Sequence, residues 1–197
     1  PVSSSFTSVT IHYNVDGVRH IVTGCRGTFV LNAAVGEIPS IDFSFTGIYN
    51  APTDTALPAV TYGNQATPLV FKNGNTSGFS LLSYSGALMN ITMDVGNTLV
   101  YRELVGGTKE VLITDRASSG SVTIESPTIA QKDYFTAALT DSSLGNLAFL
   151  HGTTAGNKVQ LTSSKVDIGD VAYGEADGVT MLEIPYTLVP SAANNEV

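Results

Sequence analysis

Residues 40–49 read SIDFSFTGIY and give the clearest sign of the fold. Apolar and polar side chains alternate along this segment, a pattern typical of a β-strand with two different faces. The apolar face carries Ile41, Phe43 and Phe45, and the polar face carries the Asp, Ser and Thr between them. Because aromatic rings bury large apolar areas, we expect the apolar face to lie in the core.

The same alternation recurs on both sides of this strand, interrupted by Gly, Asn, Asp and Pro. It predicts antiparallel strands joined by tight turns, with Asp16-Gly17, Asn73-Gly74 and Asp177-Gly178 as the strongest turn sequences. Gly24 to Gly27 is expected to separate two strands. The further strands predicted are 9–14, 18–22, 28–34, 69–72, 78–82, 87–95, 98–105, 111–115, 121–125, 145–150, 158–162 and 179–188.

One segment follows a helical pattern instead. Ser126-Pro127 is a good start for a helix, and the apolar side chains that follow predict a helix over about 127–140. The chain has no internal repeat and no linker, which predicts a single domain over residues 1–197 with a polar tail at 194–197. The predicted fold class is mainly β, an antiparallel β-sandwich or barrel-like core with one flanking α-helix and long loops.

Residues 50–68 contain three prolines and little periodicity, and they predict a long loop. Loops of this length in compact domains are usually functional or disordered. We expect this loop to contact a neighbouring subunit, and a flexible surface excursion is the alternative. The contact residues expected are Pro52, Asp54, Leu57, Pro58 and Tyr62.

Charged residues make up 13% of the chain, whereas an ordinary soluble domain has roughly 25%. Ser, Thr, Asn and Gly replace them, which indicates surface that is covered by neighbouring molecules. A Ser/Thr-rich secreted β protein would show the same composition. The single cysteine, Cys25, excludes an intrachain disulfide and suits a reducing compartment.

The net charge of −8 argues against a protein that holds nucleic acid by neutralising phosphates. An acidic wall would instead let a polyanion pass without sticking. No apolar run approaches the roughly 18 residues of a membrane span, so we expect no membrane partner.

The sequence carries few residues arranged for chemistry. None of His12, His20 and His151 has metal-binding spacing, although the first two could face each other across the first hairpin. No Gly-x-Ser-x-Gly elbow, P-loop or dinucleotide fingerprint occurs. We therefore expect no enzyme, no catalytic residues, no cofactor and no metal.

An ordered set of segments resembles the tail tube, or major tail, proteins of long non-contractile-tailed bacteriophages. These segments are 24–29, 36–49, 97–102, 113–116, 125–134, 156–159 and 177–178, and they are distributed in this order over most of the chain. No single segment is specific, because strands separated by glycine turns are common among β proteins. The resemblance comes from the order of the set.

The resemblance implies hexameric rings stacked into a hollow tube in the virion tail, assembled in the bacterial host cytoplasm. The implied partners are further copies of this chain and the tape measure, tail terminator and baseplate or tip proteins, with DNA passing through an acidic channel without specific binding during ejection. Three alternatives stay open: another virion protein such as a tail terminator or head decoration protein, an extracellular carbohydrate-binding β-sandwich, and a hydrolase with paired carboxylates.

Overall fold

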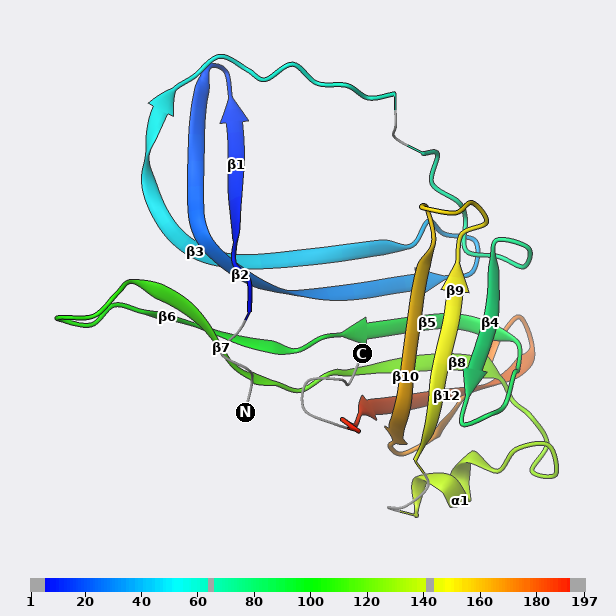
Figure 1. Ribbon diagram of the computed structural model, residues 1–197. Helices are drawn as coiled ribbons and strands as arrows, with labels where there is room; N and C mark the ends of the chain where they lie inside the picture. Colours follow the sequence, from blue (N-terminus) through cyan, green and yellow to red (C-terminus); the bar gives the residue numbers. More distant parts are fainter. Residues whose placement is uncertain (1–5, 64–65, 141–143, 192–197) are drawn as a thin grey trace. The chain divides into compact units, whose positions relative to one another are not determined.

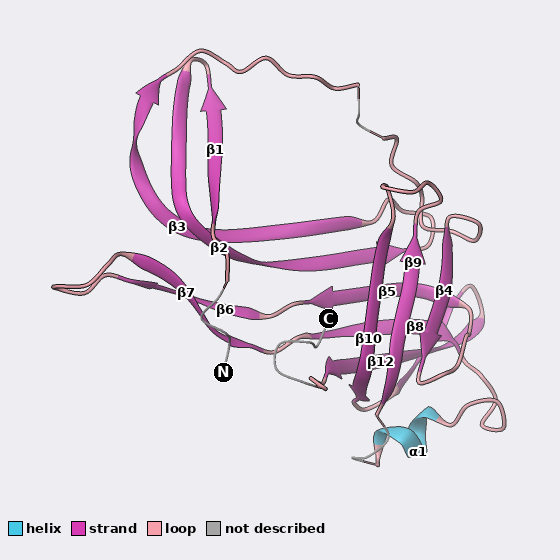
Figure 2. Ribbon diagram, viewed as in Figure 1, coloured by secondary structure: helices cyan, strands magenta, loops and turns pink. Residues whose placement is uncertain are grey.

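The computed structural model describes residues 6–63, 66–140 and 144–191. The polar tail predicted at 194–197 lies outside them. Twelve strands and one short helix form the described chain (Figures 1 and 2). The fold is mainly β, as the sequence predicted.

The chain divides into two compact units, which we describe separately. Unit 1 comprises Pro1–Phe29, Phe43–Ala66 and Gly96–Arg116, and unit 2 comprises Val30–Asp42, Thr67–Val95 and Ala117–Val197. The strands β2 (Val18–Ala34) and β3 (Ser40–Asp54) each have residues in both units. A single domain over residues 1–197 stays a prediction.

Unit 2 is an antiparallel sheet that folds back on itself. From the end of β2 the strands follow the order β5, β8, β12, β10, β9 and β4. β11 pairs with residues 179–183 of β12, whereas β10 pairs with residues 186–188 of the same strand. Their bounds are β4 Thr76–Leu81, β5 Leu88–Asp94, β8 Ser119–Glu125, β9 Gly145–His151, β10 Val159–Ile168, β11 Ala172–Ala176 and β12 Val179–Leu188. In Figure 1, β4, β9 and β10 cross the direction of β5, β8 and β12. Packing of two sheet layers in this way is typical of a β-sandwich.

Alternate side chains from these strands fill the core of unit 2. Along β12 the buried positions are every second residue from Leu182 to Leu188. Val122 lies opposite Ile184 and Ile91, so the buried side chains of three neighbouring strands share one face. The other face of these strands is polar and is described below.

The absence of a side chain at Gly120 leaves room for a hydrogen bond between β12 and β5. The buried phenol of Tyr186 donates to the backbone carbonyl of Thr92 at 2.7 Å, passing beside Gly120 on β8. A Cβ atom at Gly120 would lie 2.1 Å from that carbonyl oxygen. Burial raises the pKa of Tyr186, because the phenolate would lose its hydration.

The predicted helix is shorter than the sequence suggested. It was expected over 127–140, but α1 spans Tyr134–Ala138. Thr128 and Gln131 form a separate turn, in which the Thr128 N–H donates to the Gln131 side chain at 3.0 Å. Asp133 then begins the helix by accepting from the Thr136 N–H at 2.9 Å. The hydrogen bond from the Thr136 hydroxyl, and after it the bond from this N–H, lowers the pKa of the Asp133 carboxyl.

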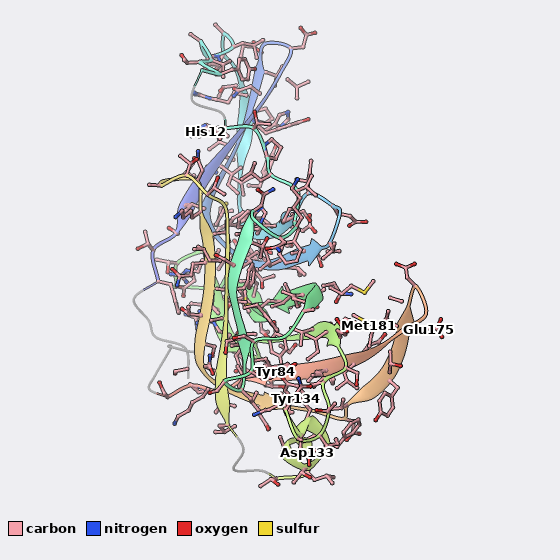
Figure 3. All side chains as sticks on the ribbon, turned by 90° about the vertical axis from the view of Figure 1, so that its right-hand side faces the viewer. His12, Tyr84, Asp133, Tyr134, Glu175 and Met181 are labelled. Carbon is pink, nitrogen blue, oxygen red and sulfur yellow. The ribbon has the colours of Figure 1, made fainter. Side chains whose placement is uncertain are left out.

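Tyr134 anchors α1 to unit 2. Its buried hydroxyl donates to the carbonyl of Leu81 at 3.2 Å, and its ring meets Tyr84 edge-on at 6.2 Å. Figure 3 shows the two rings close together above Asp133, which marks the start of the helix.

Unit 1 contains a three-stranded sheet and a two-stranded ribbon. In the sheet, β2 lies between β1 (Val9–Val15) and β3. The predicted turn at Asp16-Gly17 is confirmed, since both residues have positive φ, 44° and 84°, as a type I′ turn requires. The ribbon pairs β6 (Asn97–Arg102) with β7 (Glu110–Arg116).

Several predicted strand boundaries were wrong. The break expected between residues 22 and 28 does not exist, because β2 continues through a bulge at Gly24, where φ is 61°. Residues 69–72 form no strand, so Asn73-Gly74 is not a hairpin turn. The sequence also missed β11, which is short and mostly exposed.

The strand predicted at residues 40–49 is confirmed, but its apolar face is not core. Ile41, Phe43 and Phe45 are 36%, 61% and 46% exposed. Alternation specifies which side chains share a face, whereas only the packing of layers decides which face is covered. The prediction of burial was therefore wrong for this chain taken alone.

Candidate assembly surfaces

The five predicted contact residues all lie in unit 1 and are all exposed. Pro52 and Asp54 belong to the end of β3, so the loop begins at Thr55 and not at Asn50. Leu57, Pro58 and Tyr62 follow in the coil. None of the described residues from Ala56 to Pro68 makes a hydrogen bond within the chain. Their role as subunit contacts stays a prediction.

Unit 1 exposes much apolar surface and buries little. Among its described residues, Cys25 and Val111 are the buried apolar side chains. Its exposed large apolar residues come from β1, β3, the coil after β3, and the ribbon: Val9, Tyr13, Val15, Phe43, Phe45, Tyr49, Leu57, Val60, Tyr62, Val100, Tyr101, Leu104 and Val105. Exposed apolar surface of this extent marks an interaction site in a soluble protein.

The β3 aromatics form the densest part of this surface. Phe43 stacks on Phe45 with ring centroids 6.0 Å apart and meets Phe29 at 5.7 Å. Phe45 lies over Gly27, where a Cβ atom would come within 2.5 Å of its ring. Gly27 thus lets the ring lie flat on β2, and the outer side of the cluster is left for another molecule.

Unit 1 also presents unpaired strand edges. Within the described residues, β1 and β3 each pair with β2 on one side only, and β6 and β7 pair only with each other. Unpaired edges offer rows of N–H and C=O groups that can bind a strand of another chain. The ribbon is attached to β2, because Asn97 donates to the Gly27 carbonyl at 3.0 Å and Arg26 donates to the Val111 carbonyl.

Ion pairs fix the shape of the ribbon near its tip. Arg102 pairs with Glu110, and Lys109 pairs with Glu103 at 2.7 Å. The hydrogen bond from Lys109 lowers the pKa of the Glu103 carboxyl. These pairs are exposed and stabilise the fold only slightly. They leave the apolar tip, with Val105 fully exposed, projecting beyond them.

Unit 2 has a polar face of a different kind. It is the side of β2, β5, β8 and β12 opposite the core, and we call it the acidic face. The register brings Asn32, Thr92 and Ser121 side by side, and the hydroxyls of Thr92 and Ser121 lie 3.0 Å apart. Its charged residues are Asp94, Glu125 and Glu183, with Asp42 at the border, where it accepts from Asn32 at 3.0 Å.

The acidic face contains no cation. Residues 30–34, 88–94, 119–125 and 179–188, which supply its four strands, include no Lys or Arg. A surface of hydroxyls, amides and carboxylates without Lys or Arg repels a polyanion and gives its phosphates no cation to bind. Sequence reasoning found the acidity of the chain but not this face, because the carboxylates of the face come from three strands that are far apart in the sequence.

The histidines do not form a site. Register places His12 opposite Ile21 and His20 opposite Tyr13, so the two do not face each other. His151 instead contacts the Thr76 hydroxyl at 2.9 Å and the Leu69 carbonyl at 3.1 Å. Across the described ranges, no group of three or more metal-binding side chains is placed to hold an ion. None of the described helices has the length and apolarity to cross a membrane.

Comparison with known proteins agrees with these surfaces. A search of curated proteins found no match to the chain. The family model described as "Phage tail tube protein" matches residues 1–188 of the 197. This family consists of structural components of the virion tail that assemble into a tube. The chain therefore belongs to the phage tail tube protein family.

Proposed function

We propose that this protein polymerises as hexameric rings that stack into a hollow tail tube with an acidic channel for DNA ejection. The proposal extends the family assignment to the form of the assembly. In this form each copy contacts copies in its own ring and in the next ring.

The apolar surface and free edges of unit 1 support self-assembly. Association would cover the Phe43–Phe45 cluster and would give β1, β3 and the ribbon strands partners from adjacent copies. Closure of edges into a continuous barrel removes the aggregation hazard that an unpaired strand presents. Most subunit contacts would use surface that is apolar or uncharged, which accounts for the 13% charged residues.

The acidic face is the observation that supports a channel for DNA. It bears exposed carboxylates from three strands, and its four strands contain no Lys or Arg to hold a phosphate. We assign it to the lumen. At physiological salt the Debye length is about 8 Å, so the wall repels DNA that comes close to it and has little effect on DNA at the axis. DNA thus passes without specific binding.

The remaining parts of the proposal rest on the resemblance to the tail tube proteins of long non-contractile-tailed bacteriophages. The tube would be built in the host cytoplasm and belong to a long non-contractile tail. The tape measure protein would occupy the lumen before DNA, and the terminator and tip proteins would bind the two ends. The ends of a stacked tube expose the ring faces that stacking elsewhere covers, which gives such proteins a surface to bind.

Electron microscopy of the purified protein tests the assembly. Negative staining is expected to show long tubes with a central channel, and end-on averages are expected to show six copies. Single closed rings that never stack would indicate a terminator-like role, and a stable monomer at high concentration would overturn the proposal.

Charge reversal tests the channel separately. Asp94→Lys with Glu183→Lys places two cations on the acidic face, and tubes of this variant are expected to retain DNA in a salt-dependent manner. Glu175→Lys is the control, because Glu175 pairs with Thr180 in the register of the opposite face. Equal passage of DNA through both kinds of tube would contradict the assignment of the lumen.

A further inference from the structure

Unit 2 contains a cavity of about 420 Å³ that the proposed function does not use. Its walls include Val35, Phe71, Phe79 and Leu88, and Lys72, Thr76 and Ser77 add polar groups. A volume of this size lies within the range of binding pockets, and apolar walls with a few polar groups are typical of them.

The walls of the cavity are held in place from two directions. The Phe71 N–H donates to the Glu37 carbonyl at 2.7 Å, and the Gly36 N–H donates to the Phe71 carbonyl at 3.0 Å. The Phe71 ring meets Phe149 edge-on at 6.3 Å and lies 5.8 Å from His151. A cavity with walls so fixed does not collapse when empty, and a fixed site loses less entropy on binding.

The coil that ends beside this cavity carries exposed apolar side chains. Thr55 donates to the Gly17 carbonyl at 2.8 Å, and the Leu69 carbonyl contacts His151, so both ends of the coil are fastened. Between them Leu57, Val60 and Tyr62 are 61%, 65% and 72% exposed. We call Ala56–Tyr62 the apolar arm, although Ala56 itself contributes little.

The arm and the cavity are complementary in chemistry. Pro58 favours an extended backbone, and grooves lined with aromatic rings bind extended proline-containing segments. Asp54 is the only charged residue from Asn50 to Phe71. Lys72 stands at the cavity and has no ion-pair partner among the described residues.

We propose that the cavity of unit 2 receives the apolar arm of a second copy of this chain. The proposal rests on the proposed tube and names the surface that accepts the loop. In this contact Leu57 enters between Phe71 and Phe79, and Asp54 lies near Lys72. Since arm and cavity are different surfaces, the contact is heterologous, and its head-to-tail repetition builds a ring or a filament.

A cysteine pair tests the contact directly. Leu57→Cys with Ser77→Cys places one thiol on the arm and one at the cavity, and native Cys25 is only 1% exposed and does not compete. Oxidation of assembled protein is expected to give a ladder of covalent multimers on a non-reducing gel, because disulfides form between Cα atoms about 4.4–6.8 Å apart. Leu57→Cys with Leu139→Cys is the control, since Leu139 caps the end of α1, is exposed and does not line the cavity.

The outcomes separate this proposal from the tube itself. Tubes that give no ladder would overturn the pairing of arm and cavity and leave the tube proposal standing. A cross-linked monomer would show that the arm occupies its own cavity, which also overturns the pairing. A ladder from protein that forms no tubes would support the pairing and contradict the tube.

A charge exchange provides a second test that leaves the apolar contacts intact. Asp54→Lys alone and Lys72→Asp alone each place like charges together, and each is expected to raise the concentration needed for assembly a few-fold. The double variant restores an opposite pair and is expected to assemble like the native protein. An unrestored double variant would count against the pairing, provided that all three variants fold alike by circular dichroism.

Discussion

The exposed aromatic cluster on β3 makes the sharpest prediction. Phe43→Ser removes a side chain that is 61% exposed in the single chain and that assembly is proposed to cover. Complete burial of a Phe side chain contributes about 1.5–3 kcal/mol. The exposed fraction therefore corresponds to about 0.9–1.8 kcal/mol per contact, and since 1.4 kcal/mol is a factor of ten, the critical concentration should rise ~5- to 20-fold.

The same substitution affects folding less than assembly. The fraction already buried corresponds to a loss of about 0.6–1.2 kcal/mol in the free energy of unfolding of the monomer. Sedimentation across a concentration series measures assembly, and urea denaturation below the assembly concentration measures folding. Leu139→Ser is the matched control, because Leu139 is 83% exposed but lies on α1, outside the surfaces described. Equal critical concentrations for the two variants would refute the reasoning.

Three further predictions concern stability. Gly120→Ala should lower the free energy of unfolding by about 1–3 kcal/mol, because the new methyl group would lie 2.1 Å from a carbonyl oxygen of β5. A urea titration measures this loss. Gly63→Ala is the control and should change the free energy of unfolding little, because Gly63 has open space around it. Since burial raises the pKa of Tyr186 above the usual value of about 10, the native state binds its proton more tightly than the unfolded state. The stability linked to the neutral Tyr186 phenol is complete below pH 10 and is lost as the pH rises further. Thermal melts should therefore show a fall in stability above pH 10, and this fall should be smaller in Tyr186→Phe, which has no phenol to ionise. His151→Ala removes the contact to the Leu69 carbonyl and should release the end of the long coil, so that limited proteolysis cleaves the coil faster. An unchanged rate of cleavage would contradict this prediction.

Much of the fold could be read from local pattern. Alternation over residues 179–188 and the Asp16-Gly17 turn predicted β12 and the first hairpin, because strand periodicity and a type I′ turn are local properties of the backbone. The helix failed for a related reason. Its start depended on whether Ser126 or Asp133 capped it, and Ser and Asp are both favourable N-cap residues.

The candidate surfaces were less accessible to sequence reasoning. The acidic face gathers carboxylates from β5, β8 and β12, and only the order of strands in the sheet brings them together. The cavity depends in the same way on contacts between Phe71 and distant residues such as Phe149. Neither leaves a motif of fixed spacing along the chain.

The strand at residues 40–49 separates the two kinds of information. Its sequence alone determined an extended backbone with three apolar side chains on one face, because that follows from the two-residue period of a strand. Only the tertiary structure decided that this face lies open on the single chain, since burial depends on which layers pack over it and on how strands distant in sequence are ordered. In this protein that difference turns an expected core into a surface for assembly.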